Sequence, residues 1–156
     1  MLVSKKSDLL LLIIVVFLFF SGNTLQANEK PQETMDRILE FSIKILEKSL
    51  QSENAFIRSA AARAAGESEY SGLIPLLKKA AKDSYHTTRL FALQGIKKIS
   101  LNEARTLSID MSKDLNVWVR GAAIEMLGEL GDGKSGSIIQ SHLKSPDRTV
   151  RYAAAG

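Results

Sequence analysis

The sequence predicts an all-α protein, an α-solenoid in which helix pairs stack with a period of 31 residues. The first observation behind this prediction is an arginine that returns at that interval, with an alanine three residues after each one. These residues are Arg58, Arg89, Arg120 and Arg151, followed by Ala61, Ala92, Ala123 and Ala154. The second is a small polar residue of a helix-starting type six residues before each arginine, namely Ser52, Asp83, Asp114 and Ser145. Internal repeats of about 20–50 residues are typical of solenoids.

The period divides the chain into segments. Residues 1–27 form a predicted signal peptide, residues 28–51 an N-terminal capping helix, and residues 52–156 the repeats, as units 52–82, 83–113, 114–144 and a partial unit 145–156. The expected first helices are 54–66, 85–99 and 116–130, and the expected second helices are 72–82, 103–113 and 134–144. We expect Ser71 to cap the first of the second helices, with Pro75 in its first turn. The middle unit diverges, because Thr88 stands where the others have Ile57, Val119 and Val150.

The N-terminus has the order of features of a secretory signal peptide. Lys5 and Lys6 precede an unbroken apolar run of 12 residues, Leu9–Phe20, and a small-residue site ends at Ala27. The run is short for a membrane span, which needs about 20 apolar residues. We therefore expect export to a bacterial periplasm or the cell exterior, with a membrane anchor formed by residues 9–20 as the alternative. The absence of cysteine excludes a lipid-modified N-terminus and any disulfide framework.

The stretch from Gln32 to Leu50 predicts an amphipathic helix that covers the open apolar end of the first repeat. Its apolar stripe consists of Met35, Ile38, Leu39, Phe41, Ile45, Leu46 and Leu50. Within the first helices, small residues recur at three- and four-residue spacing and predict a face that stacks against the next repeat. They are Ala60, Ala61, Ala64, Ala65, Ala122 and Ala123.

The run Val119–Asp132, with the pattern Val-Arg-x-Ala-Ala-x-x-x-Leu-Gly-x-x-Gly-Asp, resembles the HEAT-like repeat of the phycobilisome-lyase type. Ile57–Gly66 and Val150–Ala154 match the opening of the same pattern, and His86–Ile99 matches it more loosely. The resemblance implies a right-handed stack of helix pairs whose second helices line a concave surface. Repeats of this type serve many unrelated proteins, so the resemblance indicates the fold more than the function.

Enzyme chemistry has no candidate residues in this sequence. Only two histidines occur, His86 and His142, and no phosphate-binding glycine loop, Ser/His/Asp grouping or metal-ligand spacing is found. The net charge of +4 is not concentrated in one basic run, which disfavours nucleic acid as a partner. We therefore expect a protein without catalysis, cofactor or metal.

Two sets of repeated charges have structural interpretations. We expect the arginine ladder (Arg58, Arg89, Arg120 and Arg151) to bond between repeats, with Asp83 and Asp114 as available partners, because arginine suits multidentate pairing. Lys82, Lys113 and Lys144 recur at the same period and are expected at the ends of second helices, where cations interact favourably with the helix dipole.

The candidate binding residues are two aromatics and a polar face. Phe56 and Trp118 stand two residues before an arginine, where Thr87 and Thr149 show the usual type; each either anchors a partner or packs over a loop between repeats. The second helices add Lys78, Lys82, Ile109, Lys113 and Lys144. These residues favour an exported, non-catalytic scaffold that binds a protein or peptide. The alternative is an accessory subunit of a chromophore- or cofactor-lyase complex, against which the signal peptide argues, since those lyases work in the cytoplasm.

Overall fold

A computed structural model describes residues 31–131 and 133–156 of the chain. The predicted signal peptide and the alternative anchor at residues 9–20 lie outside the described residues. The chain divides into two compact units, residues 1–39 and 40–156, and each is described by itself. Among the described helices, none has the length and apolar character that a membrane span requires.

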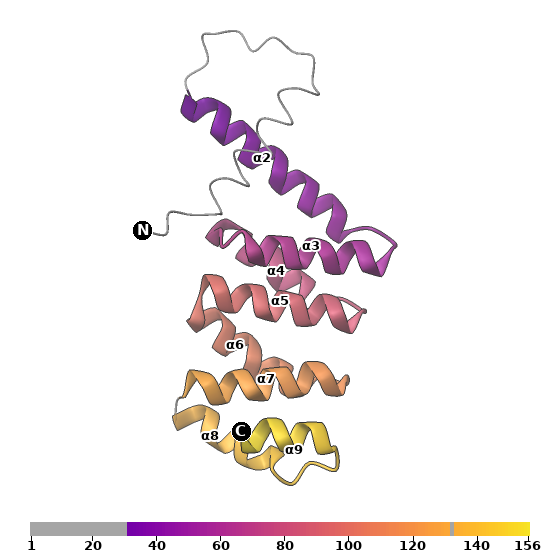
Figure 1. The fold of residues 1–156 in the computed structure, drawn as a ribbon, viewed down its shortest axis with the longest axis vertical. Coiled ribbons are helices and arrows are strands. Elements are labelled where there is room, and N and C mark those ends of the chain that lie inside the picture. The colour runs from indigo at the N-terminus through magenta and orange to yellow at the C-terminus, as the bar shows by residue number, and fades with distance from the viewer. Residues whose placement is uncertain (1–30, 132) are drawn as a thin grey trace, which may run out of the picture. The chain divides into compact units, whose positions relative to one another are not determined.

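The described residues are all-α, with eight α-helices and one 3₁₀ turn (Figure 1). The helices are α2 (Pro31–Leu50), α3 (Ala55–Glu67), α4 (Ile74–Ala80), α5 (His86–Ile99), α6 (Leu101–Met111), α7 (Val117–Leu130), α8 (Gly133–His142) and α9 (Arg148–Ala155), and the turn η1 is Ser71–Leu73. The three expected first helices agree with α3, α5 and α7 to within one residue at each end.

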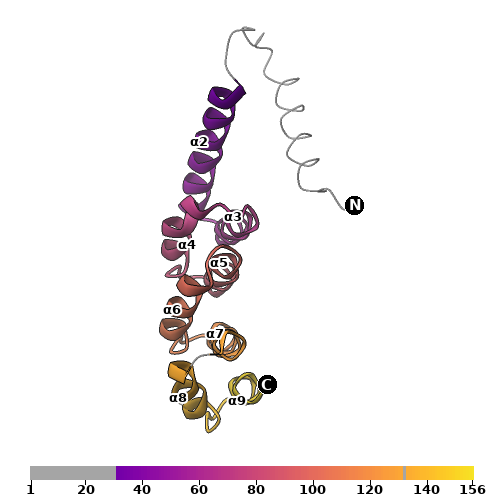
Figure 2. The same cartoon turned by 90° about the vertical axis from the view of Figure 1, so that its left-hand side faces the viewer.

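In the unit of residues 40–156 the helices pack as sequential pairs. Helices α3, α5, α7 and α9 form one layer in which each contacts the next, and α4, α6 and α8 form the second layer (Figures 1 and 2). Each helix of the second layer packs against the first-layer helices that precede and follow it in the chain.

Helices of the first layer begin at side chains that accept hydrogen bonds from the first turn. Asn54, Asn116 and Asp147 are the N-caps of α3, α7 and α9, and each accepts from the amide two residues later. Tyr85 cannot act this way for α5, and its own amide donates instead to Asp83 at 2.7 Å. Helix α7 ends at Gly131 with φ of 48°, the left-handed conformation that glycine adopts without strain.

Ser71 does not cap the second helix of the first pair. It begins η1 instead, and the N-cap of α4 is Leu73, which makes no side-chain cap bond. Pro75 lies in the first turn of α4, as predicted. The 3₁₀ turn takes the place of the first residues of the expected helix, so α4 is only 7 residues long.

The core of the second unit lies between the two layers. Its largest fully buried apolar side chains are Leu77, Leu93, Ile96, Ile124 and Leu127. Helix α2 has no buried residue, but Ile43, Leu46 and Leu50 pack partly against this core. Phe41 and Ile45, which were expected to cover the first repeat, remain exposed.

The expected stacking face of small residues is only partly right. Ala61, Ala65 and Ala123 are buried, whereas Ala60 and Ala64 are exposed. The buried alanines are four residues apart, and each exposed one precedes them by one residue, a rotation of about 100° around the helix. The predicted stripe was therefore too wide.

Candidate functional site

The arginines of the ladder each hold the loop that precedes their own helix. In all four, Nη1 donates to the two backbone carbonyls five and six residues earlier. For Arg58 these carbonyls belong to Ser52 at 2.8 Å and Glu53 at 3.0 Å. For Arg120 they belong to Asp114 at 2.5 Å and Leu115 at 3.4 Å. The same contacts at Arg89 and Arg151 give the loops a common geometry.

Two of these arginines also bind an aspartate of the next loop through their second edge. Arg58 donates from Nε and Nη2 to Asp83 at 2.7 and 3.0 Å, and Arg89 donates to Asp114 at 2.8 and 2.6 Å. The aspartate side chains are only 10% and 11% exposed. Bidentate pairing with arginine is stronger and more directional than a single charged contact. These pairs therefore join consecutive helix pairs.

The pairs change the acidity of both carboxyl groups. The hydrogen bond from Arg58 lowers the pKa of Asp83, against a smaller opposing effect of burial. Burial raises the pKa of Asp114, but hydrogen bonds from Arg89 and the Asn116 amide, with the charges of Arg89 and Arg120, together outweigh it and lower the pKa. Both aspartates are thus held in their charged form.

The two candidate aromatics differ in their surroundings. Phe56 is 73% exposed, and its ring meets the Tyr85 ring edge-on at 5.9 Å, so it packs over the loop that follows. Trp118 is 60% exposed and has no aromatic neighbour of this kind among the described residues. The packing interpretation thus fits Phe56, and Trp118 is the stronger binding candidate.

Trp118 lies at an open groove of about 880 Å³ formed by α5, α7 and α9, with Ile139 contributed by α8. Tyr152 adds a second exposed ring, at 61%. Gly121, Ala122 and Ala153 give the groove a floor of small residues. Apolar surface with exposed aromatic rings and small residues suits a peptide side chain or a helix face better than a small polar ligand.

The charge of the groove is acidic. Glu125 and Glu129 line it, and no lysine or arginine does. Glu129 is paired with Lys97 of α5, whereas Glu125 is exposed. The groove thus differs in sign from the chain as a whole, whose net charge is +4.

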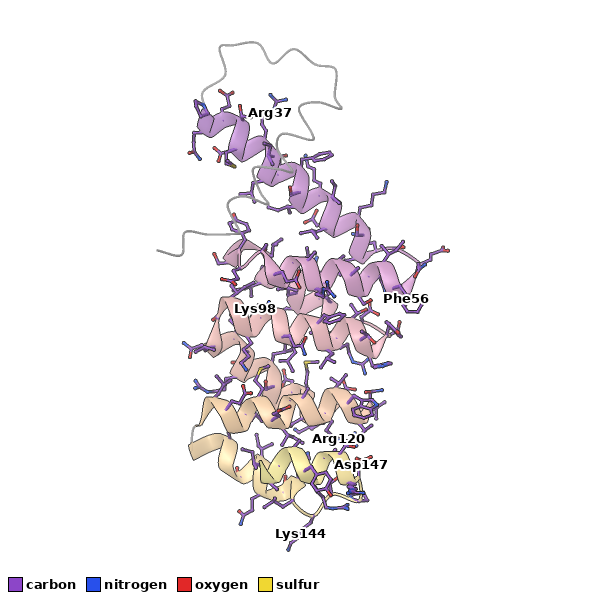
Figure 3. All side chains as sticks on the ribbon, in the orientation of Figure 1. Arg37, Phe56, Lys98, Arg120, Lys144 and Asp147 are labelled. Atoms are coloured by element: carbon purple, nitrogen blue, oxygen red, sulfur yellow. The ribbon has the colours of Figure 1, made fainter. Side chains whose placement is uncertain are left out.

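The predicted lysines are not brought into this groove. Lys78 pairs with Glu103 at 2.7 Å, joining α4 to α6. Lys82, Lys113 and Lys144 are exposed and lie two residues beyond the ends of α4, α6 and α8, rather than within them. Ile109, expected as an exposed apolar group, is half-buried. Figure 3 shows Phe56, Arg120 and Asp147 along one side of the second unit, with Lys98 on the opposite side.

Sequence reasoning missed Tyr152 and Leu115. Tyr152 follows Arg151 directly, where the other units have Ser59, Leu90 and Gly121. Leu115 is 99% exposed in the loop before α7, and its counterparts at the 31-residue interval are Glu53, Ser84 and Pro146. An apolar residue where the other units have polar residues or proline is the signal that was available.

No catalytic arrangement appears in the described part of the chain. No group of three or more His, Asp or Glu side chains there is placed to hold a metal ion. The ring nitrogens of His142 lie at 2.8 Å from the Ile138 carbonyl and 3.0 Å from the Ser112 carbonyl, so backbone groups occupy both. No family model matches the chain, and no curated protein matches it.

Proposed function

We propose that this protein is an exported, non-catalytic scaffold that binds a protein or peptide partner in the groove beside Trp118. We also propose that residues 52–156 form a right-handed α-solenoid of HEAT-like repeats. The recurring contacts support the solenoid, because Arg58–Asp83 and Arg89–Asp114 are the same bond one period apart. Repeats that contact only their neighbours in this way are the basis of solenoid architecture.

The observation that carries the binding proposal is the exposed ring of Trp118 at the wall of an apolar groove. Tryptophan is enriched among residues that dominate binding energy, because its large rigid ring buries much surface at little entropic cost. Nothing in the ladder or in the core of the second unit requires a ring at this position, since Thr87 and Thr149 occupy it in neighbouring pairs.

A peptide selection tests the proposal directly. Trp118 is the only tryptophan in the chain, so its fluorescence reports occupancy of the groove without a label. Peptides selected from a random library on the intact protein are expected to change this emission. Trp118→Ala should weaken their binding at least about tenfold, the effect of losing a hot-spot contact, while the melting temperature stays nearly constant.

Phe56→Ala is the matched control, because Phe56 occupies the same position of the repeat and contacts Tyr85 instead of lining the groove. Peptide affinity should be unchanged in this variant. Peptides that bind the wild type and Trp118→Ala equally well would place the binding surface elsewhere.

The export part of the proposal rests on the charge and apolar pattern of residues 1–27. Cleavage after Ala27 gives a mature chain that begins at Asn28, which N-terminal sequencing of exported material checks. Retention of Met1 in a membrane fraction would indicate the anchor instead.

A further inference from the structure

We propose that the unused edge of Arg120, its Nε and Nη2 atoms, is a carboxylate-binding site. The occupant that fits it is an aspartate side chain in an extended segment of the partner. The identity of the partner rests on the proposed function, whereas the site itself is tested with a small acidic peptide.

The ladder shows how such a site is filled. The Nε and Nη2 atoms of Arg58 and Arg89 each hold the two oxygens of one aspartate. Both aspartates stand 25 residues after their arginine. The residue at that distance from Arg120 is Ser145, which carries no carboxylate. Among the described residues, none makes an ion pair with Arg120.

The loop at Ser145 has kept the shape of the loops that carry the aspartates. The hydroxyl of Ser145 accepts from the Asp147 amide at 3.3 Å, as Asp83 accepts from Tyr85 at 2.7 Å. Asp114 accepts from Asn116 in the same way, at 2.8 Å. Nη1 of Arg120 is also fixed on its own loop. The guanidinium and the facing loop are therefore both in place, and the carboxylate alone is missing.

Asp147 is the acidic residue nearest in sequence to this site, but its carboxylate is engaged elsewhere. Oδ1 of Asp147 accepts from the amides of Thr149 at 2.8 Å and Val150 at 3.4 Å, at the start of α9. Moving it to Arg120 would leave these helix-terminal amides without their cap. A guanidinium stays charged at every relevant pH, so Arg120 retains its positive charge.

The surroundings favour a peptide as the source of the carboxylate. Leu115, whose carbonyl contacts Arg120, is 99% exposed, and Trp118 lies in the first turn of the same helix. An acidic residue flanked by apolar side chains complements this combination of charge and apolar surface. Aspartate is the residue whose length already fits the two filled sites.

The probe is the tripeptide acetyl-Leu-Asp-Leu-amide, with acetyl-Leu-Asn-Leu-amide as its neutral match. In an NMR titration of the intact protein, the Nε–H signal of Arg120 is expected to shift with the aspartate peptide and not with the asparagine peptide. Arg89, whose site is filled, serves as the internal control and should not respond. Equal responses of Arg89 and Arg120, or none at Arg120, would overturn the proposal.

Ser145→Asp tests the same site from within the chain. The new carboxylate is expected to pair with Arg120, raise the melting temperature by about 2–4 °C and abolish the response to the aspartate peptide. Ser145→Asn, which has the same shape without the charge, should preserve the response. An unchanged response in Ser145→Asp contradicts the inference.

Two further outcomes separate the inference from the function it rests on. If selected peptides need Trp118 but bind Ser145→Asp with wild-type affinity, the scaffold stands and the carboxylate site fails as a partner contact. If the tripeptide shifts Arg120 but no selected peptide needs Trp118, the site stands and the proposed function fails. A response that appears only in Asp147→Asn would show that Asp147 fills the site, which also overturns the inference.

Discussion

At the scale of single residues, the middle helix pair has an unusually polar interior. Thr88 is fully buried where the other units have Ile57, Val119 and Val150, and its hydroxyl has no hydrogen-bond partner. Ser108 is likewise buried without a partner. A buried hydroxyl that makes no hydrogen bond loses its hydration without compensation. The divergence that the sequence shows at position 88 is thus a local weakness in the core.

Replacing Thr88 with valine is expected to stabilise the protein. Valine has nearly the same shape, so the change removes the desolvation cost of the hydroxyl and creates no cavity. The free energy of unfolding should rise by about 1 kcal/mol, measured by urea denaturation.

Thr106→Val is the control, because the Thr106 hydroxyl is exposed and donates to the Asn102 carbonyl at 3.1 Å. This change should be neutral or slightly destabilising. A loss of stability in Thr88→Val would mean that the buried hydroxyl makes a hydrogen bond in solution.

At the scale of helices, α3 and α5 meet through backbone rather than side chains. Gly66 and Gly95 face each other, and both are buried. A Cβ added to Gly95 would lie 2.7 Å from the Cα of Gly66, and one added to Gly66 would lie 2.3 Å from the Cα of Gly95. Backbone atoms cannot turn aside as a flexible side chain can, so any larger residue pushes the helices apart.

We therefore expect Gly95→Ala to lower the free energy of unfolding by about 1–3 kcal/mol, the usual cost of overpacking. The loss occurs even though alanine favours a helix over glycine by about 1 kcal/mol.

Gly128→Ala supplies the comparison, since Gly128 also lies within a helix and a Cβ there meets nothing within 4 Å. That variant should gain stability from helix propensity. Chemical denaturation of both variants measures the contrast, and equal effects at the two glycines would disprove the close crossing of α3 and α5.

This helix crossing shows where the sequence pattern stops being informative. The first helices follow from residues that recur at 31-residue spacing, and their bounds were predicted to within one residue. Gly66 and Gly95 are 29 residues apart, and their counterparts one period later are Lys97 and Met126. The contact is not repeated, so periodicity could not reveal it.

The candidate site was predicted in part for the same reason. Trp118 stood out because a ring replaces the threonine of neighbouring units. The lysines were grouped by their shared interval, but residues with one interval lie along a line, whereas the groove runs across α5, α7 and α9. Tyr152 joins Trp118 there only through packing of α9 on α7, which no single repeat contains.

At the scale of the molecule, charge links consecutive helix pairs at several places. Lys78–Glu103 and Lys97–Glu129 are about half exposed, and such pairs contribute little because water and salt screen them. Arg58–Asp83 and Arg89–Asp114 are mostly shielded from solvent and bidentate. The arginine pairs should therefore dominate the electrostatic part of stability.

This gives stability a definite dependence on pH. Folding lowers the pKa of Asp83 and Asp114, so the unfolded chain binds more protons than the folded one in the acid range. The stabilisation is complete above the ordinary pKa of aspartate, about 3.9, and is lost as pH falls through the lowered values. Urea denaturation between pH 7 and pH 2 should show stability falling steeply below about pH 4.

The double variant Asp83→Asn, Asp114→Asn identifies the groups responsible. It should be less stable at pH 7, because two mostly buried guanidinium groups lose their charged partners. Its stability should also fall less steeply in acid, since the two shifted carboxyl groups are gone. Glu40→Gln is the control, as the fully exposed pair with Lys44 should contribute little to the acid slope. An acid slope as steep as that of the wild type would assign the loss of stability to other carboxyl groups.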